Sequence, residues 1–185
     1  LSTSAAAFAS ATPIILPGAP GEASRVIAAE EATRLSDTSY APGDVTFMQG
    51  MIVHHQQAVE LAELVADRTN NEDLVTVAGR IDASQKDEMD FMRGWLSDRS
   101  LALSAEGMGH AHHAMKGMAS PEQLADLRAA NGTAFDRLFL QLMIAHHQGA
   151  LDMVEELHDQ PGTAYDPVMF EFTNDVVNDQ KTEIE

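Results

Sequence analysis

The chain has no cysteine and little positive charge. Without cysteine it can form no disulfide bond and offer no thiolate ligand, so methionine is the remaining source of a soft sulfur donor. Its 11 Lys and Arg residues stand against 29 Asp and Glu residues, which gives a formal net charge of -18. Such a charge repels phosphate backbones and anionic lipid surfaces, and no stretch approaches the roughly 18 apolar residues of a membrane span. We therefore expect neither nucleic-acid binding nor membrane insertion.

The composition is otherwise that of one folded domain with an extension. With 185 residues, 44% of them hydrophobic, the chain can bury a core of ordinary size. Residues 1–43 are rich in Ala, Ser and Pro; we expect an N-terminal extension here, with a short helix over residues 25–36. Its small residues are typical of the processing region of an exported protein, which favours a secreted protein at the cell-envelope exterior or in the periplasm. Residues 44–185 are expected to form the domain.

One segment of this domain occurs twice. Residues 44–63, DVTFMQGMIVHHQQAVELAE, return 92 positions later as residues 136–155, DRLFLQLMIAHHQGALDMVE, with ten of the twenty positions identical. Chance would give about one or two identities, so the chain contains an internal repeat. A shorter match follows each copy: Gln85-Lys86-x-Glu88-Met89 and Gln180-Lys181-x-Glu183-Ile184. Each unit therefore predicts a helical hairpin.

The apolar residues of both units recur at helical spacing, and no strand is expected. Two similar hairpins, residues 44–99 and 133–185, would each expose an apolar stripe, and packing them together buries both. The expected fold is all-α, a ferritin-like four-helix bundle in which residues 100–132 form a long crossover.

Several helix ends can be predicted from the sequence. The N-caps expected are Asp44, Asn70 or Asn71, Ser120 and Asp166, and Gln123 should complete a capping box with Ser120. The first helix is expected to run to about residue 68.

The repeated histidines fall on the apolar side of their helices. At 100° per residue, His55 lies in the middle of the apolar stripe and His54 on its flank. The repeat gives His147 and His146 the same two positions. One histidine from each hairpin should therefore face the interior of the bundle.

A methionine lies one turn before each histidine pair. Met51 shares a helix face with His55, and Met143 has the same relation to His147, so a thioether and an imidazole can converge on one ion. This combination favours copper(I), because zinc more often takes Cys or carboxylate ligands and calcium and magnesium take oxygen. The candidate ligands are Met51, His54, His55, Met143, His146 and His147. A core histidine bonded to a neighbouring side chain is the alternative at any single position.

The crossover contains a second group of the same residue types. Among its Gly and Ala residues lie Met108, His110, His112, His113, Met115 and Met118. Short His-rich tracts bind metals, so this group is a candidate second metal site, and a loop of low complexity is the alternative.

Catalysis has less support in the sequence. A di-iron centre in such a bundle needs a Glu-x-x-His motif twice, whereas Glu155-x-x-His158 occurs once and its repeat partner, Glu63-x-x-Ala66, lacks the histidine. No nucleophile elbow or phosphate-binding loop is present, and no catalytic residue is assigned. A non-catalytic helical scaffold with structural histidines stays open as a second function, and a metal-dependent oxidoreductase as a third.

The doubled Met-Ile-x-His-His-Gln block and the two Gln-Lys-x-Glu elements resemble the domain of unknown function 305 family, from residue 44 to the end of the chain. The resemblance implies an exported bacterial protein with a ferritin-like bundle, and some members bind copper in the periplasm or cell exterior. Leu140 and Ile184 stand where the first unit has Met48 and Met89, so we do not expect a strictly symmetric site. The hypothesis is an exported monomer or homodimer that binds copper(I) for sequestration or delivery, without turnover.

Overall fold

The computed structural model describes residues 13–18, 23–28, 40–104 and 115–185 and divides the chain into two units, residues 1–39 and 40–185. The first unit contains two antiparallel strands, β1 (Ile14–Leu16) and β2 (Arg25–Ile27), with Ile14 opposite Ile27. The short helix expected from residue 25 and the absence of strands are therefore wrong. The β-branched residues of both segments favour paired strands over an isolated turn of helix. Residues 29–36 of the expected helix lie outside the described residues.

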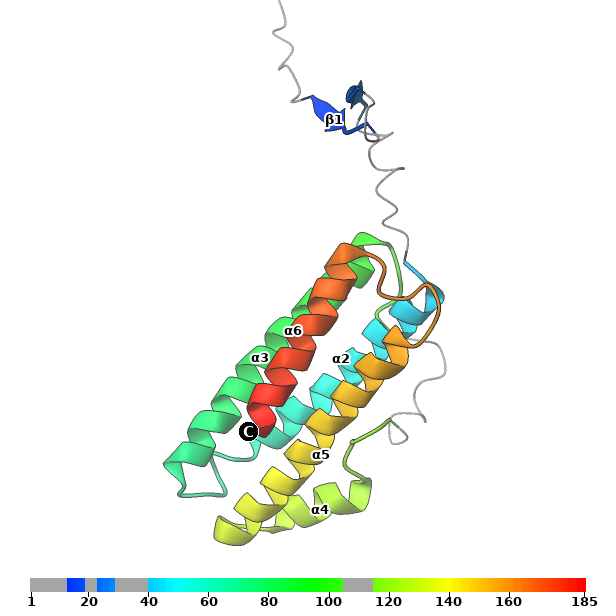
Figure 1. Ribbon diagram of the computed structural model, residues 1–185. Helices are drawn as coiled ribbons and strands as arrows, with labels where there is room; N and C mark the ends of the chain where they lie inside the picture. The colour runs from blue at the N-terminus through cyan, green and yellow to red at the C-terminus, as the bar shows by residue number, and fades with distance from the viewer. Residues whose placement is uncertain (1–12, 19–22, 29–39, 105–114) are drawn as a thin grey trace, which may run out of the picture. The chain divides into compact units, whose positions relative to one another are not determined.

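The second unit is an all-α four-helix bundle, as predicted (Figure 1). Helices α2 (Pro42–Glu63) and α3 (Glu72–Asp98) form one antiparallel hairpin, and α5 (Gly132–His158) and α6 (Pro167–Ile184) form the other. The short helix α4 (Pro121–Ala129) lies on the crossover beside α5. Helices α2 and α5, which carry the two copies of the repeat, pack against each other.

Most of the predicted helix ends are confirmed. The Asn71 side chain accepts hydrogen bonds from the backbone of Asp73 and Leu74, and Ser120 forms the expected capping box with Gln123. Asp166 likewise caps α6.

The first helix differs from the prediction at both ends. It begins at Pro42, before the expected cap Asp44, because proline is preorganised for the first helical position. Asp44 instead accepts hydrogen bonds of 2.8 Å from the backbone of Ala41 and of Ala164, which ties α2 to the loop between α5 and α6. The helix ends at Glu63, about one turn earlier than expected.

The core consists of two apolar clusters. The first, near the beginning of α2, includes Met48, Met51, Met92, Trp95, Leu157 and Met169. The second, near the beginning of α5, includes Leu61, Ile81, Leu127, Phe135, Phe139 and Met143. Along α5 the change from one cluster to the other falls between Met143 and Ala150, where His146 and His147 lie. On α2 the histidines lie between Ile52 of the first cluster and Ala58 of the second, and Val59 still packs with the first. A polar layer therefore separates the two halves of the core.

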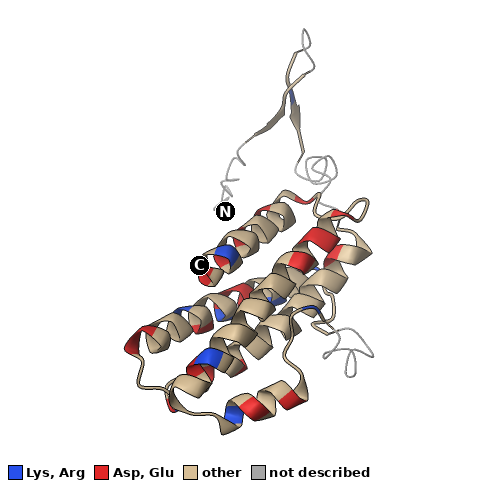
Figure 2. Ribbon diagram, turned by 60° about the horizontal axis from the view of Figure 1, so that its bottom comes forward, with Lys and Arg blue, Asp and Glu red and all other residues tan. Residues whose placement is uncertain are grey.

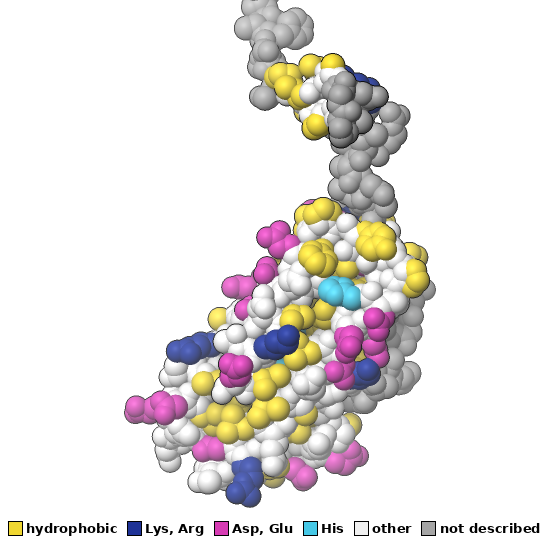
Figure 3. All heavy atoms as spheres, in the orientation of Figure 1, with side chains coloured by type: hydrophobic (Ala, Val, Ile, Leu, Met, Phe, Trp, Pro, Cys, Tyr) yellow, Lys and Arg dark blue, Asp and Glu magenta, His cyan; other side chains and the backbone are white. Residues whose placement is uncertain are grey.

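The surface carries the acidic surplus of the sequence. Asp and Glu residues occur along all the helices of the bundle (Figure 2), and apolar side chains are exposed between charged ones on the face seen in Figure 3. Among the described residues, no helix has the length and apolar character needed to cross a membrane.

Candidate metal-binding site

Eight polar residues form the layer between the two apolar clusters. Helices α2 and α5 each contribute a histidine pair, and α3 and α6 each contribute a glutamine followed by a glutamate. We call this group the polar layer: His54, His55, Gln85, Glu88, His146, His147, Gln180 and Glu183. The four histidines and the two glutamines are at most 1% exposed. The two histidines expected to face the interior do so, and the flanking pair is buried as well.

His54 and His146 lie against each other where α2 and α5 meet. Their ring centroids are 3.8 Å apart, with the ring planes tilted by 34°. The Nε2 atom of His54 lies 2.9 Å from the carbonyl oxygen of Lys116, and that of His146 lies 2.8 Å from the carbonyl oxygen of His54. A carbonyl oxygen can only accept, so in both rings Nε2 carries the hydrogen and donates it. The Nδ1 atom of each neutral ring therefore has a free lone pair.

His55 and His147 face the other two helices, and each meets a glutamate. His55 Nε2 contacts the Glu88 carboxyl of α3, and His147 Nε2 lies 2.7 Å from Glu183 Oε2 of α6. The second pair is close but not aligned as a hydrogen bond. Ser84 donates a hydrogen bond of 2.7 Å to the other carboxyl oxygen of Glu183. The two halves of the repeat thus place the same residue types in the same relation.

Burial disfavours the charged forms of four members of the polar layer. Desolvation, followed by repulsion from neighbouring histidines, lowers the pKa of His54 and of His55 to about 3 and that of His146 well below its ordinary value. Desolvation, followed by repulsion from Glu183, raises the pKa of Glu88 to about 8. At neutral pH the contact between His55 and Glu88 is therefore a hydrogen bond between neutral groups and not an ion pair. Neutral imidazoles are the form that binds metal ions.

The polar layer holds more donors and acceptors than it uses. Of the 15 buried side-chain nitrogen and oxygen atoms without a hydrogen-bond partner in the described residues, 11 belong to it. They include Nδ1 of all four histidines and both polar atoms of Gln85 and of Gln180. A buried polar atom without a partner costs about 1–3 kcal/mol. Histidines that ligate metals characteristically donate their second ring nitrogen to a carbonyl or carboxylate. His54, His55 and His146 each bond such an oxygen through Nε2, and Nε2 of His147 lies beside one.

The two predicted methionine ligands lie on opposite sides of the polar layer. Met51 belongs to the first apolar cluster and Met143 to the second, because α2 and α5 run antiparallel. Each thioether therefore accompanies the histidine pair of its own helix. Within the described residues, no group of three or more His, Asp or Glu side chains is arranged to hold a metal ion. An ion bound here needs a thioether ligand or a shift of the side chains.

Residues 115–120, which we call the strap, cover the His54 side of the polar layer. Besides the bond from His54 to Lys116, the Gln57 side chain bonds both the backbone N–H and the carbonyl of Ala119, at 2.7 and 3.1 Å. Gly117 lies directly on Gly149 of α5. Gln57 and Gly149 occupy equivalent positions of the repeat but differ in residue type, and the strap explains this difference. Gln57 bonds the strap, and the absence of a side chain at Gly149 leaves space for it.

The candidate second metal site is only partly described. Met115 and Met118 lie on the strap and are half-buried. Met115 lines a surface cavity of about 600 Å³ together with Phe47 and Met153. The remaining members, Met108, His110, His112 and His113, lie outside the described residues. The Glu155-x-x-His158 motif is not part of the polar layer. Both residues are exposed, and His158 bonds Thr173 of α6.

The sequence prediction missed the residues that α3 and α6 add to the polar layer. Gln85, Glu88, Gln180 and Glu183 belong to the shorter repeated match, but no site was assigned to them. Their repetition at one spacing, on the helices that face the histidine helices, was the signal that could have identified them.

The fold and the site together define the class of protein. It is a four-helix bundle made of two repeated hairpins around a buried layer of histidine, glutamine and glutamate. The chain belongs to the DUF305 family, a domain of unknown function, whose family model matches residues 44–185. No match was found among curated proteins.

Several solved structures are similar to this chain, and two of them are DUF305 proteins. A DUF305 fragment from Deinococcus radiodurans is 32% identical, with a TM-score of 0.69, over 78% of this chain and 92% of that one. A DUF305 protein of Streptomyces coelicolor, inferred to be secreted, is 30% identical, with a TM-score of 0.67, over 77% of this chain and 86% of that one. CopM in its Cu(I)-bound form is 28% identical, with a TM-score of 0.60, over 76% of this chain and 89% of that one. CopM is also solved in a Cu(II)-bound form.

Proposed function

We propose that this protein is an exported metal-binding protein that holds copper(I) through histidine and methionine, for sequestration or delivery. The observation that carries the proposal is the state of the four buried histidines. Each has its Nε2 atom beside a carbonyl or carboxyl oxygen and its Nδ1 atom buried without a partner in the described residues. The similarity to CopM, whose structures contain copper, and to a DUF305 protein inferred to be secreted supports the choice of ion and of location.

The donor set favours a soft ion. Imidazole nitrogen together with thioether sulfur suits copper(I), whereas a carboxylate-rich set would suit harder ions. Met51 and Met143 are the thioethers nearest in sequence to the histidine pairs, and both are buried. We assign Met51, His54, His55, Met143, His146 and His147 as the ligands.

The other members of the polar layer position these ligands. The Lys116 carbonyl fixes the tautomer and the ring orientation of His54, and Glu88 and Glu183 hold the rings of His55 and His147. Copper supplies no chemistry in this proposal, since it is the cargo and is taken up and released unchanged.

An anaerobic copper(I) titration against a competing chelator tests the proposal. The variants are His55→Ala, His147→Ala and the double variant, and His158→Ala is the control because His158 is exposed and outside the polar layer. We expect the double variant to lose copper(I) affinity at least tenfold and the control to retain it. Replacing Met108, His110, His112 and His113 together tests the crossover separately. If only this last change abolishes binding, the polar layer is not the site; if no metal binds or raises the melting temperature, the histidines are structural.

A further inference from the structure

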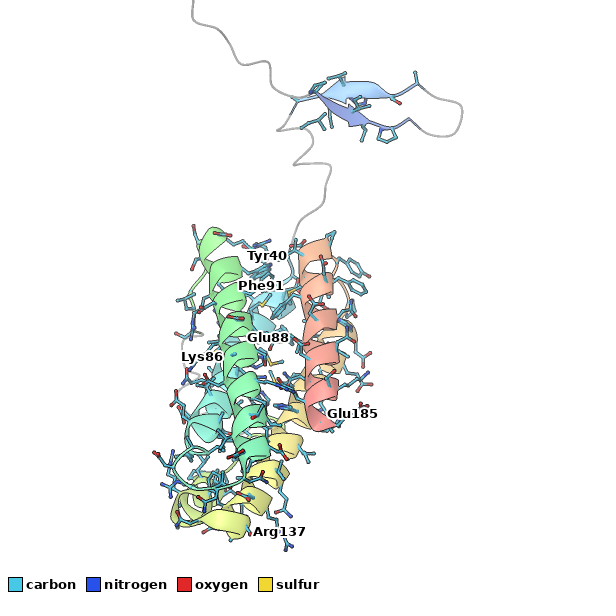
Figure 4. The ribbon with its side chains drawn as sticks, turned by 90° about the vertical axis from the view of Figure 1, so that its left-hand side faces the viewer. Tyr40, Lys86, Glu88, Phe91, Arg137 and Glu185 are labelled. Carbon is cyan, nitrogen blue, oxygen red and sulfur yellow. The ribbon has the colours of Figure 1, made fainter. Side chains whose placement is uncertain are left out.

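A groove runs between α3 and α6, on the side of the bundle away from the strap. It contains two surface pockets, of about 290 and 410 Å³, which share Asp179 as a lining residue. Figure 4 looks onto this pair of helices and shows Glu88 on the side of α3 turned towards α6. The two helices come from different hairpins and pack less extensively than the helices within each hairpin.

Each pocket ends at a glutamate of the polar layer. Glu88 lines the smaller pocket and Glu183 the larger one. The same two carboxyls contact the buried imidazoles of His55 and His147. Their side chains are 10% and 14% exposed, so each carboxyl reaches from the pocket wall to a histidine that solvent does not touch. On the opposite side, the strap covers His54.

The smaller pocket of the groove carries a concentration of negative charge, whereas the lining of the larger pocket includes one cation, Arg80, beside Asp179, Glu183 and Glu185. The smaller pocket is lined by Asp87, Glu88, Phe91, Val168, Glu171, Phe172, Asp175 and Asp179, without any Lys or Arg. Asp179 lies near Glu88 and Glu183. Burial, followed by repulsion from these two carboxyls, raises the pKa of Asp179. A cleft lined by charges of one sign raises the local concentration of the opposite ion and its rate of association.

Next to these two glutamates, the polar layer contains groups that have no partner in the part of the chain that the structure describes. Gln85 and Gln180 lie one turn before Glu88 and Glu183 on the same helix faces. Both side chains are fully buried, and their oxygen and nitrogen atoms have no hydrogen-bond partner among the described residues. One oxygen of Glu88 is likewise buried without a partner. The acidic surface thus leads to buried oxygen atoms and then to imidazole nitrogens.

We infer that the α3–α6 groove is the entrance through which cations reach the polar layer, with Glu88 and Glu183 passing them to His55 and His147. This inference rests on the proposed metal binding and adds to it the route and the oxygen ligands along the route. The exposed carboxylates Asp87, Asp175 and Asp179 gather hydrated cations. The carboxyl oxygens of the two glutamates then replace water around the ion before it reaches nitrogen and sulfur, and Glu88 releases its proton to solvent as the cation arrives.

The test compares two triple variants of the full chain that change the charge equally. The groove variant is Asp87→Asn, Asp175→Asn and Asp179→Asn. The control variant is Glu60→Gln, Asp67→Asn and Asp126→Asn, at exposed positions on α2, the loop after it and α4. Aquated silver(I), a soft ion that is stable in water, is mixed with each protein in a stopped-flow instrument. Fluorescence of Trp95, which packs in the same apolar cluster as Met51, reports capture.

We expect the groove variant to capture silver(I) about tenfold more slowly than the wild type in dilute buffer, and the control variant to stay within about twofold. Sodium nitrate should reduce the difference, because salt screens exposed charges. Equal rates for the two variants would overturn the entrance while leaving metal binding intact. A wild-type protein that takes up neither silver(I) nor copper(I) at equilibrium would instead overturn the proposed function, and the entrance with it.

Discussion

Replacing Gly149 by alanine tests how closely the strap is packed against the histidine helices. A Cβ atom at this position would lie 2.0 Å from the Lys116 carbonyl oxygen and 2.8 Å from Gly117 Cα. These neighbours are backbone atoms, so the strap itself has to move. Its movement would stretch the hydrogen bond from His54 to Lys116 and those between Gln57 and Ala119.

The size of the effect follows from packing. Inserting a methyl group into a packed interior costs about 1–3 kcal/mol, partly offset by the higher helix propensity of alanine, worth about 1 kcal/mol. A Cβ atom added at Gly94, within α3, would meet no neighbouring atom within 4 Å, so Gly94 is the matched control. Gly94→Ala should gain up to about 1 kcal/mol, so we expect the two variants to differ by about 1–3 kcal/mol in free energy of unfolding.

Urea unfolding monitored by circular dichroism measures this difference. A lower midpoint for Gly149→Ala than for wild type, with a higher midpoint for Gly94→Ala, is the expected result. If Gly149→Ala is as stable as Gly94→Ala, the strap does not rest on α5 and our explanation of the broken repeat symmetry is wrong.

Three further predictions concern the polar layer and the end of the bundle. Burial raises the pKa of Glu88 to about 8, whereas the unfolded chain releases this proton near pH 4.5. Between these values the folded state binds the proton and the unfolded state does not, so the protein loses stability as the pH rises from about 4.5 to 8. Glu88→Gln should therefore become more stable relative to wild type across this range in urea titrations at several pH values; a constant difference would contradict the raised pKa. Met51→Leu and Met143→Leu should each cost less than about 1.5 kcal/mol yet weaken copper(I) binding, whereas Met169→Leu, in the same apolar cluster as Met51, should leave the affinity unchanged in a chelator competition. Arg99→Lys should lower stability by about 1 kcal/mol, because the Arg99 guanidinium lies 4.2 Å from the centroid of the Trp95 ring and bonds buried Asp166 at 3.0 Å. Arg93→Lys is the control: Arg93 belongs to an exposed ion pair, so this change should have little effect on the melting temperature.

The bundle was predictable because local signals agree with the packing. Asn71, Ser120 and Asp166 cap their helices through their own side chains, so the sequence alone defines these ends. The position of Asp44 was not predictable in this way, because one of its carboxylate oxygens bonds Ala164, which is 120 residues away. The strands of the first unit were missed because three-residue strands leave almost no periodic pattern.

The histidine half of the polar layer was predicted from the sequence, and the glutamate half was missed although its repetition was visible there. Helical periodicity places His55 and His147 in the interior whatever the partner helix supplies. It does not give the rotation of α3 and α6, which decides whether Glu88 and Glu183 face the histidines or the solvent. The strap depends on contacts between Lys116, Gly117 and Gly149, which only the folded crossover brings together.

Nitrogen-15 NMR of the histidine side chains during anaerobic copper(I) titration tests the central claim most directly. Before copper is added, His54 and His146 should show the tautomer with hydrogen on Nε2. Copper(I) is diamagnetic, and its binding should shift the Nδ1 resonances of His54, His55, His146 and His147 while that of His158 stays in place. The claim is that the four buried histidines bind copper(I) through Nδ1. Shifts confined to the histidines of the crossover, or tautomers with hydrogen on Nδ1 in the metal-free protein, would contradict this claim.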